Sequence, residues 1–403
     1  MTMSPSSEAN RALGLSTFAF VICFAVWTIF AIIGIQIREQ LSLTETQFGL
    51  LIGMPVLTGS LVRIVLGVLT DRLGGRVVYT LTMLAAALAT FLLGWAQTYN
   101  QMLLAALGVG LAGGSFAVGV AYVSRFYSSA KQGTALGIFG VGNVGAALTK
   151  FVAPFVMVAY GWQATAQIWA AVLALTAILF WIFSKDDPVT IQRRGASAPL
   201  RSLKAEFAPL KNVQVWRFAA YYFFSFGAFV ALALWLPRYL IGVYGFDIKT
   251  AGMIGAAYSI PASIFRAYGG VLSDRIGART VMYWTLIVSL AATAILAIPS
   301  GVSTPVFLVV IFVLGFFMSL GKAAVFKHIP TYYPQNVGAV GGLVGMIGGL
   351  GGFFLPLLFG WLKDTTGLWS SCFAVLFLLV AGCLIWMHVS IRRLNRAPAL
   401  QTA

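Results

Sequence analysis

Twelve apolar stretches divide this chain of 403 residues. Each has roughly 20 residues, which as a helix rising ~1.5 Å per residue cross the ~30 Å hydrocarbon core of a bilayer. Hydrophobic residues form 60% of the chain and charged residues 9%, a composition that excludes a soluble globule. The stretches cover residues 15–37, 47–69, 77–97, 101–124, 132–157, 163–183, 218–241, 249–272, 280–298, 304–326, 337–360 and 369–391. We expect an all-α membrane protein with twelve transmembrane helices.

Lys and Arg are distributed unevenly between the predicted loops. With a cytoplasmic N-terminus, 18 basic residues lie in the cytoplasmic loops and tails. The four in the outer loops are Arg38, Arg238, Lys249 and Lys363. The excess of positive charge on one side predicts that both termini are cytoplasmic. The net charge of +16 needs no nucleic acid, because anionic lipids of the inner leaflet are the ordinary partners of such loops.

The chain is expected to form two related halves, 1–183 and 218–403, joined by a cytoplasmic linker over 184–217. The linker contains three prolines and interrupts the apolar pattern. The segment RIVLGVLTDRLGGR, which starts at Arg63, aligns without a gap with RAYGGVLSDRIGAR, which starts 203 residues later at Arg266. Such a repeat predicts two pseudo-symmetric six-helix bundles with a substrate site between them, near the middle of the membrane.

Four basic residues lie inside the apolar stretches, where no acidic residue accompanies them: Arg63, Lys150, Arg266 and Lys322. A cation at this depth costs at least ~2.5 kcal/mol on insertion scales, so it is expected to face a cavity. Asp71 follows Arg63 by eight residues, which places Arg63 ~12 Å from the helix end, and Arg266 repeats this depth. The set predicts an anionic substrate. For the arginines, snorkelling to the membrane surface or bonding to helix carbonyls is the alternative.

Several motifs carry a family resemblance. GVLTDRLGGR (67–76) and GVLSDRIGAR (270–279) resemble the loop signature of the major facilitator superfamily. The Gly-rich stretches GIFGVGNVGAA (137–147) and GGLVGMIGGLGGFF (341–354) resemble the paired signatures of its nitrate/nitrite porters. The resemblance implies the major facilitator fold and nitrate as the substrate. The sequence TKFVAP around Lys150 resembles the branch of these porters that couples nitrate to protons.

The resemblance also implies a substrate site. Arg63 and Arg266 would bind the anion, since a planar guanidinium matches a small planar oxyanion. Phe116, Tyr222 and Phe226 occupy places where nitrate porters enclose a planar anion between aromatic rings. By spacing alone, Tyr222 and Phe226 share a helix face.

Backbone and amide groups are expected to complete this site. Asn143 is an amide in an apolar helix, which is unfavourable unless it has a partner. Gly142 and Gly348 lie in the two Gly-rich stretches, where exposed backbone would add neutral donors. The alternative for these glycines is close packing of helices, the ordinary use of small residues in membranes.

The two lysines bear on coupling. Proton symport needs a group that exchanges a proton, and this chain has no carboxylate within the apolar stretches. Desolvation beside other cations disfavours a charged ammonium, so Lys150 or Lys322 could serve as that group. Snorkelling of either lysine remains the alternative.

These observations predict a monomeric secondary transporter that imports nitrate across a bacterial cytoplasmic membrane, coupled to protons. Nitrate/nitrite antiport is the first alternative, and carriage of nitrite stays open. Export of organic cations is disfavoured, because the apolar stretches lack acids. A membrane enzyme or receptor would need a catalytic cluster or a soluble sensor domain. The cysteines Cys23, Cys372 and Cys383 have no metal-ligand spacing, so no metal or cofactor is expected.

Overall fold

The computed structural model describes residues 5–193, 211–299, 302–333 and 337–396, and every regular element in these ranges is helical. The N-terminal half contains α1 (Pro5–Trp27), α2 (Phe30–Gln40), α3 (Glu45–Leu73), α4 (Gly75–Leu93), α5 (Tyr99–Val109), α6 (Leu111–Ser124), α7 (Ser129–Gly140), η1 (Val141–Val144) and α8 (Gly145–Phe183). The short α9 (Pro188–Arg193) follows. The C-terminal half contains α11 (Val213–Tyr222), η3 (Phe223–Ala228), α12 (Phe229–Tyr244), α13 (Ile248–Ile276), α14 (Ala278–Leu296), α15 (Thr304–Tyr332), α16 (Val337–Thr366) and α17 (Ser371–Arg396).

The expected all-α membrane architecture is confirmed. Within the described residues, ten helical segments are long and apolar enough to cross a membrane. One of them, Ala135–Phe183, contains two predicted spans, because Gly161 breaks the helix with φ 82°. The remaining predicted span is α13, which is 29 residues long but less apolar than its neighbours. When Ala135–Phe183 is counted as two spans and α13 is added, twelve segments correspond to the twelve predicted spans.

The two repeated strips have the same local structure. Helices α3 and α13 are each 29 residues long, and α4 and α14 are each 19 residues long. The turn between the helices of each pair is a glycine with positive φ, Gly74 at 88° and Gly277 at 87°. Glycine adopts this conformation without strain, which other residues rarely do. The separation of 203 residues therefore relates whole helix pairs, not only the two motifs.

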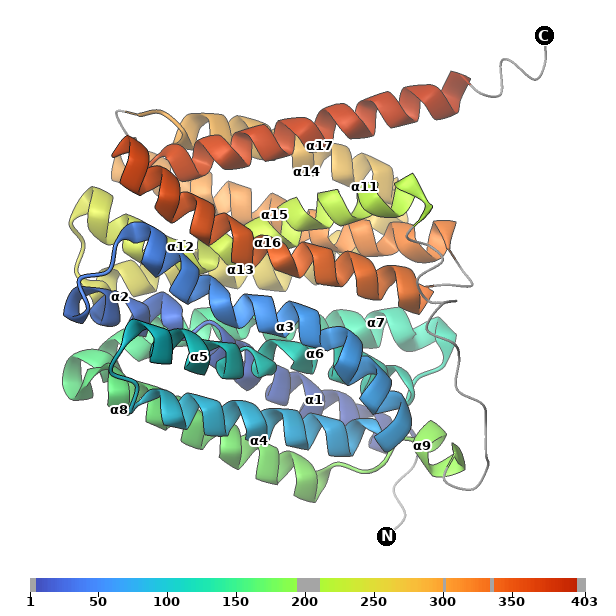
Figure 1. The fold of residues 1–403 in the computed structure, drawn as a ribbon. Coiled ribbons are helices and arrows are strands. Elements are labelled where there is room, and N and C mark those ends of the chain that lie inside the picture. The colour runs from blue at the N-terminus through green and yellow to red at the C-terminus, as the bar shows by residue number, and fades with distance from the viewer. Residues whose placement is uncertain (1–4, 194–210, 300–301, 334–336, 397–403) are drawn as a thin grey trace.

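Figure 1 shows the two halves one above the other, with α1 to α8 below and α11 to α17 above. The first and last described residues lie at the same end of the bundle as α9. We call this end the linker end. Residues 194–210 of the predicted linker lie outside the described residues. The division at 184–217 stays a prediction.

Close backbone contact joins the halves away from the linker end. A Cβ atom on Gly49 of α3 would lie 2.2 Å from the carbonyl oxygen of Pro356 in α16. A Cβ atom on Gly360 of α16 would lie 2.1 Å from the carbonyl oxygen of Glu45. Only glycine permits such an approach, as in other packed membrane helices. The antiparallel α3 and α16 thus form a tight seam between the halves (Figure 1).

The two most buried spans are irregular at their centres. In the most apolar 18 residues of spans Ser7–Gln40 and Val213–Tyr244, 89% of the residues are buried. The first changes from α1 to α2 at Thr28, and the second contains a π-helical segment, Phe223–Ala228. π segments often mark functional sites, because they displace side chains from the regular helical positions. The π segment here begins next to Tyr222 and contains Phe226.

Candidate functional site

Arg63 is buried in α3 and points toward the other half of the protein. Its Nε donates to the carbonyl oxygen of Gly59 at 3.1 Å, and its Nη1 donates to that of Gly345 in α16 at 3.1 Å. Its Cζ lies 5.5 Å from the ring centre of Phe116 and 5.9 Å from that of Phe226. Carbonyl bonding, the alternative considered for this arginine, therefore occupies two of its five N–H groups. Three remain for another acceptor.

A continuous row of aromatic rings connects Arg63 to Arg266. Phe226 stacks on Tyr222 with ring centres 5.1 Å apart and planes 9° apart. Tyr222 meets Phe326 edge to face at 4.9 Å, and Cζ of Arg266 lies 5.7 Å from the ring of Phe326. Tyr222 and Phe226 thus lie on one face of the helix, as their spacing predicts, and their role toward a substrate stays a prediction. Phe326 was not predicted, although it lies one helical turn beyond Lys322.

Arg266 lies across the seam from its repeat partner. It is partly exposed, and a Cβ atom on Gly140 of α7 would lie 3.8 Å from its Cζ, Nε and Nη1. The row of rings formed by Phe226, Tyr222 and Phe326 has Arg63 at one end and Arg266 at the other. Among the described residues, neither takes part in an ion pair. The structure thus brings both predicted arginines to one region at the interface of the halves.

The Gly-rich stretches serve packing and leave room at the arginines. A Cβ atom on Gly348 would lie 2.2 Å from the ring of Tyr222, so the missing side chain makes space for that ring. A Cβ atom on Gly142 would lie 2.3 Å from the ring of Phe20, which makes Gly142 a packing position. Asn143 is buried in the 3₁₀ turn Val141–Val144, and its Nδ2 has no hydrogen-bond partner among the described residues. A buried amide donor without a partner is available to a ligand.

Lys150 and Lys322 are both fully buried, so neither snorkels. Lys322 donates to the carbonyl oxygen of Ala262 at 2.7 Å, and its Nζ lies 3.4 Å from the ring centre of Phe229. The Nζ of Lys150 has no hydrogen-bond partner in the described part of the chain. Its side chain lies against α13 of the opposite half, where a Cβ atom on Gly255 would be 2.8 Å from Cδ of Lys150. Among the described residues, Lys150 therefore has a buried amine at the interface without a hydrogen-bond partner.

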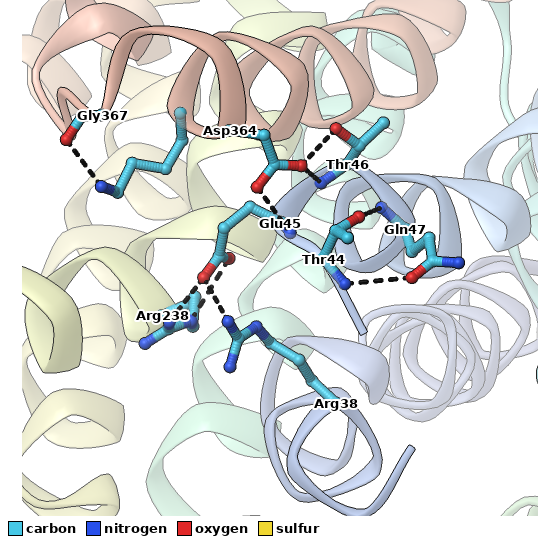
Figure 2. Close-up of polar contacts among 9 residues, drawn as sticks. Arg38, Thr44, Glu45, Thr46, Gln47, Arg238, Asp364 and Gly367 are labelled. Atoms are coloured by element: carbon cyan, nitrogen blue, oxygen red, sulfur yellow. Dashed lines mark hydrogen bonds and ion pairs between the residues drawn. The ribbon is translucent and has the colours of Figure 1, made fainter. Parts of the chain in front are cut away.

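A polar cluster joins the halves where α3 begins, at the end of the bundle opposite the linker end (Figure 1), and Figure 2 shows its contacts. Glu45, at the start of α3, pairs with Arg38 of α2 at 2.8 Å and with Arg238 of α12 at 2.5 Å. Asp364 of α16 accepts from the backbone N–H of Glu45 at 3.0 Å and of Thr46 at 2.7 Å. Glu45 occupies a buried first helical turn directly after Thr44, which caps α3.

The chain is similar to known transporters along nearly its whole length. The model of the Major Facilitator Superfamily matches residues 15–256 and 244–402. A Thermus thermophilus protein named "Probable nitrate/nitrite antiporter NarK1" is 41% identical over 418 residues, covering 96% of this chain and 93% of that protein. The chain belongs to the nitrate/nitrite porter family of the major facilitator superfamily. The resemblance read from the loop signatures and Gly-rich stretches is thereby confirmed.

Further relatives of this porter agree with the assignment. A Staphylococcus haemolyticus protein named "Probable nitrate transporter NarT" is 33% identical, covering 94% of this chain and 96% of that protein. A bacterial homologue of the lysosomal transporter Spinster, solved in an inward-facing and occupied conformation, has a TM-score of 0.77 at 16% identity over 97% of this chain and 98% of its own. The nucleoside transporter NupG has a TM-score of 0.74 at 15% identity, covering 94% of this chain and 99% of that chain. At such identities, the structural likeness supports the fold alone.

Proposed function

We propose that this porter imports nitrate across the cytoplasmic membrane of a bacterium by alternating access, coupled to protons. The observation that carries the proposal is the pair Arg63 and Arg266, which lie at the two ends of one row of aromatic rings at the interface, without an ion-pair partner among the described residues. Two permanent cations within a membrane-spanning bundle call for an anion. The names of the Thermus and Staphylococcus relatives support nitrate as that anion.

The chemistry of the site fits a planar monovalent oxyanion. The free N–H groups of Arg63 form a planar fork that can bind two oxygens of one ligand. The ring faces of Phe116 and Phe226 border this guanidinium and would enclose a flat ligand. The free amide of Asn143 adds a neutral donor. Neutral donors suit an ion of low charge density. Two cations alone would not discriminate such an ion from chloride.

The end of the bundle that contains Glu45, where polar contacts join the halves, is proposed to face outward. With both termini in the cytoplasm, the Glu45 cluster lies at the outer surface, and the linker end faces the cytoplasm. The polar contacts between Glu45 and Arg238 then separate the site from the outside, while release proceeds toward the linker end. Alternating access requires these contacts to break when nitrate enters. The porter is proposed to work as a monomer surrounded by membrane lipids.

Lys150 is proposed as the proton-coupling residue, with Lys322 as the second candidate. Lys150 is buried and has no hydrogen-bond partner in the described ranges, whereas Lys322 is held by a carbonyl and a ring. Nitrate/nitrite exchange is the competing mechanism. It is favoured by the name of the Thermus relative, which is 41% identical to this chain.

Proteoliposomes distinguish these mechanisms. We expect an inward nitrate gradient to acidify vesicles that contain a pH-sensitive dye and no nitrite. Nitrate uptake that occurs only when the vesicles are loaded with nitrite would establish exchange instead. If nitrate moves under neither condition while the protein is folded, the proposed substrate is wrong.

A further inference from the structure

Ser60 is a buried hydroxyl beside the arginine pair with no role assigned so far. It lies in α3 and is fully buried, and its Oγ has no hydrogen-bond partner in the part of the chain that the structure describes. In a helix, a serine hydroxyl ordinarily bonds to the carbonyl one turn earlier. A buried donor left without a partner is unfavourable for stability, so its presence requires an explanation.

The position of Ser60 supplies that explanation. Ser60 precedes Arg63 by three residues, so both side chains lie on the same face of α3. That face contacts Gly349 of α16. A Cβ atom on Gly349 would lie 2.4 Å from Oγ of Ser60 and 3.6 Å from Nη1 of Arg63. The hydroxyl of Ser60 and the guanidinium of Arg63 therefore both lie beside Gly349, whose missing side chain makes room for the hydroxyl.

The internal repeat contains the same arrangement with a different outcome. Ser263 precedes Arg266 by three residues, 203 positions after Ser60 and Arg63. Ser263 is also fully buried, but its Oγ donates to the carbonyl oxygen of Ser259 at 2.8 Å. The hydroxyl in the C-terminal half is thus already bonded, and the one in the N-terminal half is free. The two arginines have chemically different surroundings although they are related by the repeat.

We propose that Ser60 donates a hydrogen bond to the anion bound by Arg63, which makes it a further specificity-determining residue. The inference rests on the proposed nitrate transport. It places the bound anion closer to Arg63 than to Arg266, since the hydroxyl one turn before Arg63 has no partner among the described residues, whereas the hydroxyl one turn before Arg266 is already bonded. A hydroxyl offers one directed hydrogen bond without adding charge. It therefore favours an oxyanion with a lone pair in that direction over a spherical halide.

The test compares Ser60→Ala with Ser263→Ala in the purified full-length protein, using potassium nitrate in equilibrium binding titrations. A lost hydrogen bond to a charged partner corresponds to a rise in Kd of about ten-fold or more. We expect this rise for Ser60→Ala and less than about a two-fold change for Ser263→Ala, whose hydroxyl bonds within its own helix. Without nitrate, Ser60→Ala should melt at or above the wild-type Tm, because it removes an unsatisfied donor.

Other outcomes separate the hypotheses. A nitrate Kd for Ser60→Ala that matches wild type, or equal effects of both alanine variants, would overturn the role of Ser60 while nitrate transport stands. Failure of the wild-type protein to bind nitrate would overturn both. If Ser60→Ala does not fold, Ser60→Cys keeps the size of the side chain with a weaker donor. It should then raise the Kd, and an unchanged Kd for that variant would equally refute the proposal.

Discussion

Arg238 in the C-terminal half donates to both carboxylate oxygens of Glu45 in the N-terminal half, with Nε 3.3 Å from Oε2 and Nη2 2.5 Å from Oε1. Both side chains are largely buried, and Arg38 approaches the same carboxylate. Charged pairs with little exposure are sensitive to loss of one partner, because the other charge is left uncompensated. The contact between Glu45 and Arg238 therefore holds the two halves together at one end of the bundle.

Replacing Glu45 by Gln should open this end of the protein. The change leaves Arg38 and Arg238 facing each other without a counter-ion, which disfavours the closed arrangement by about 3 kcal/mol or more. Ile52 lies two helical turns further along α3 and is fully buried. In an Ile52→Cys background, the rate of labelling by a membrane-impermeant maleimide should rise about ten-fold or more. Glu39→Gln is the matched control, since Glu39 is an exposed acid at the same end. Equal labelling in both variants would show that Glu45 does not control opening.

Replacing Arg63 or Arg266 by Lys should abolish most nitrate binding in a protein that still folds. A flexible ammonium cannot reproduce the planar fork, nor in the case of Arg63 the bonds to Gly59 and Gly345. We expect the nitrate Kd to rise at least ~10-fold, with the lost binding free energy converted to Kd as for Ser60→Ala. Binding titrations with nitrate measure it.

The control for the arginine variants is Arg76→Lys. Arg76 has a comparable environment away from the site, with Nη2 donating to the carbonyl oxygen of Trp181 at 2.6 Å and Cζ 4.2 Å from the Trp181 ring. Its replacement should leave the nitrate Kd unchanged. Near-normal binding by both Arg63→Lys and Arg266→Lys would refute the proposed anion site.

Phe226→Ala should weaken nitrate binding more than Phe223→Ala. Phe226 stacks on Tyr222 and borders the guanidinium of Arg63, so its loss removes one wall of the site. Phe223 belongs to the same π segment and provides a change of equal size. We expect the nitrate Kd to separate the two variants while their Tm values fall together, since both lose a packed ring. Equal binding defects would indicate general loss of packing.

Much of the fold could be predicted from local sequence. Apolar length predicted the spans, and the strips from Arg63 and Arg266 predicted the repeat that α3 and α13 display. The two arginines were identified because an intramembrane cation is conspicuous in an apolar sequence. Ser60 could have been found by extending the same alignment three residues toward the N-terminus, where Ser263 matches it.

The remaining contacts of the site depend on residues far apart in the chain. Glu45 and Arg238 are 193 positions apart, and locally Glu45 has the pattern of an ordinary acidic first turn after a Thr cap. Phe326 was missed because aromatic residues are common in this chain, and only the packing of α15 against α11 brings it to Tyr222. Such pairings follow from how the two halves dock, which helix periodicity does not encode.

Lys150→Gln should abolish proton-driven accumulation of nitrate while leaving residual nitrate binding. Lys150 is buried at the interface without a hydrogen-bond partner, so its charge responds to what occupies the neighbouring site. A bound anion favours the protonated lysine, and by linkage the protonated lysine favours the anion. Nitrate affinity in the wild-type protein should therefore fall as pH rises, and Lys150→Gln should flatten this dependence.

Lys322→Gln provides the comparison for Lys150. Its ammonium is held by the carbonyl oxygen of Ala262 and the ring of Phe229, so its loss should lower the Tm more than it alters the pH dependence of binding. Accumulation is measured in proteoliposomes with an imposed pH gradient and no nitrite, and affinity by nitrate titrations at a series of pH values. If Lys150→Gln still concentrates nitrate under these conditions, Lys150 does not couple the proton. A flat pH profile in Lys322→Gln instead would assign coupling to Lys322, because only a group that gains and loses the proton can make affinity depend on pH.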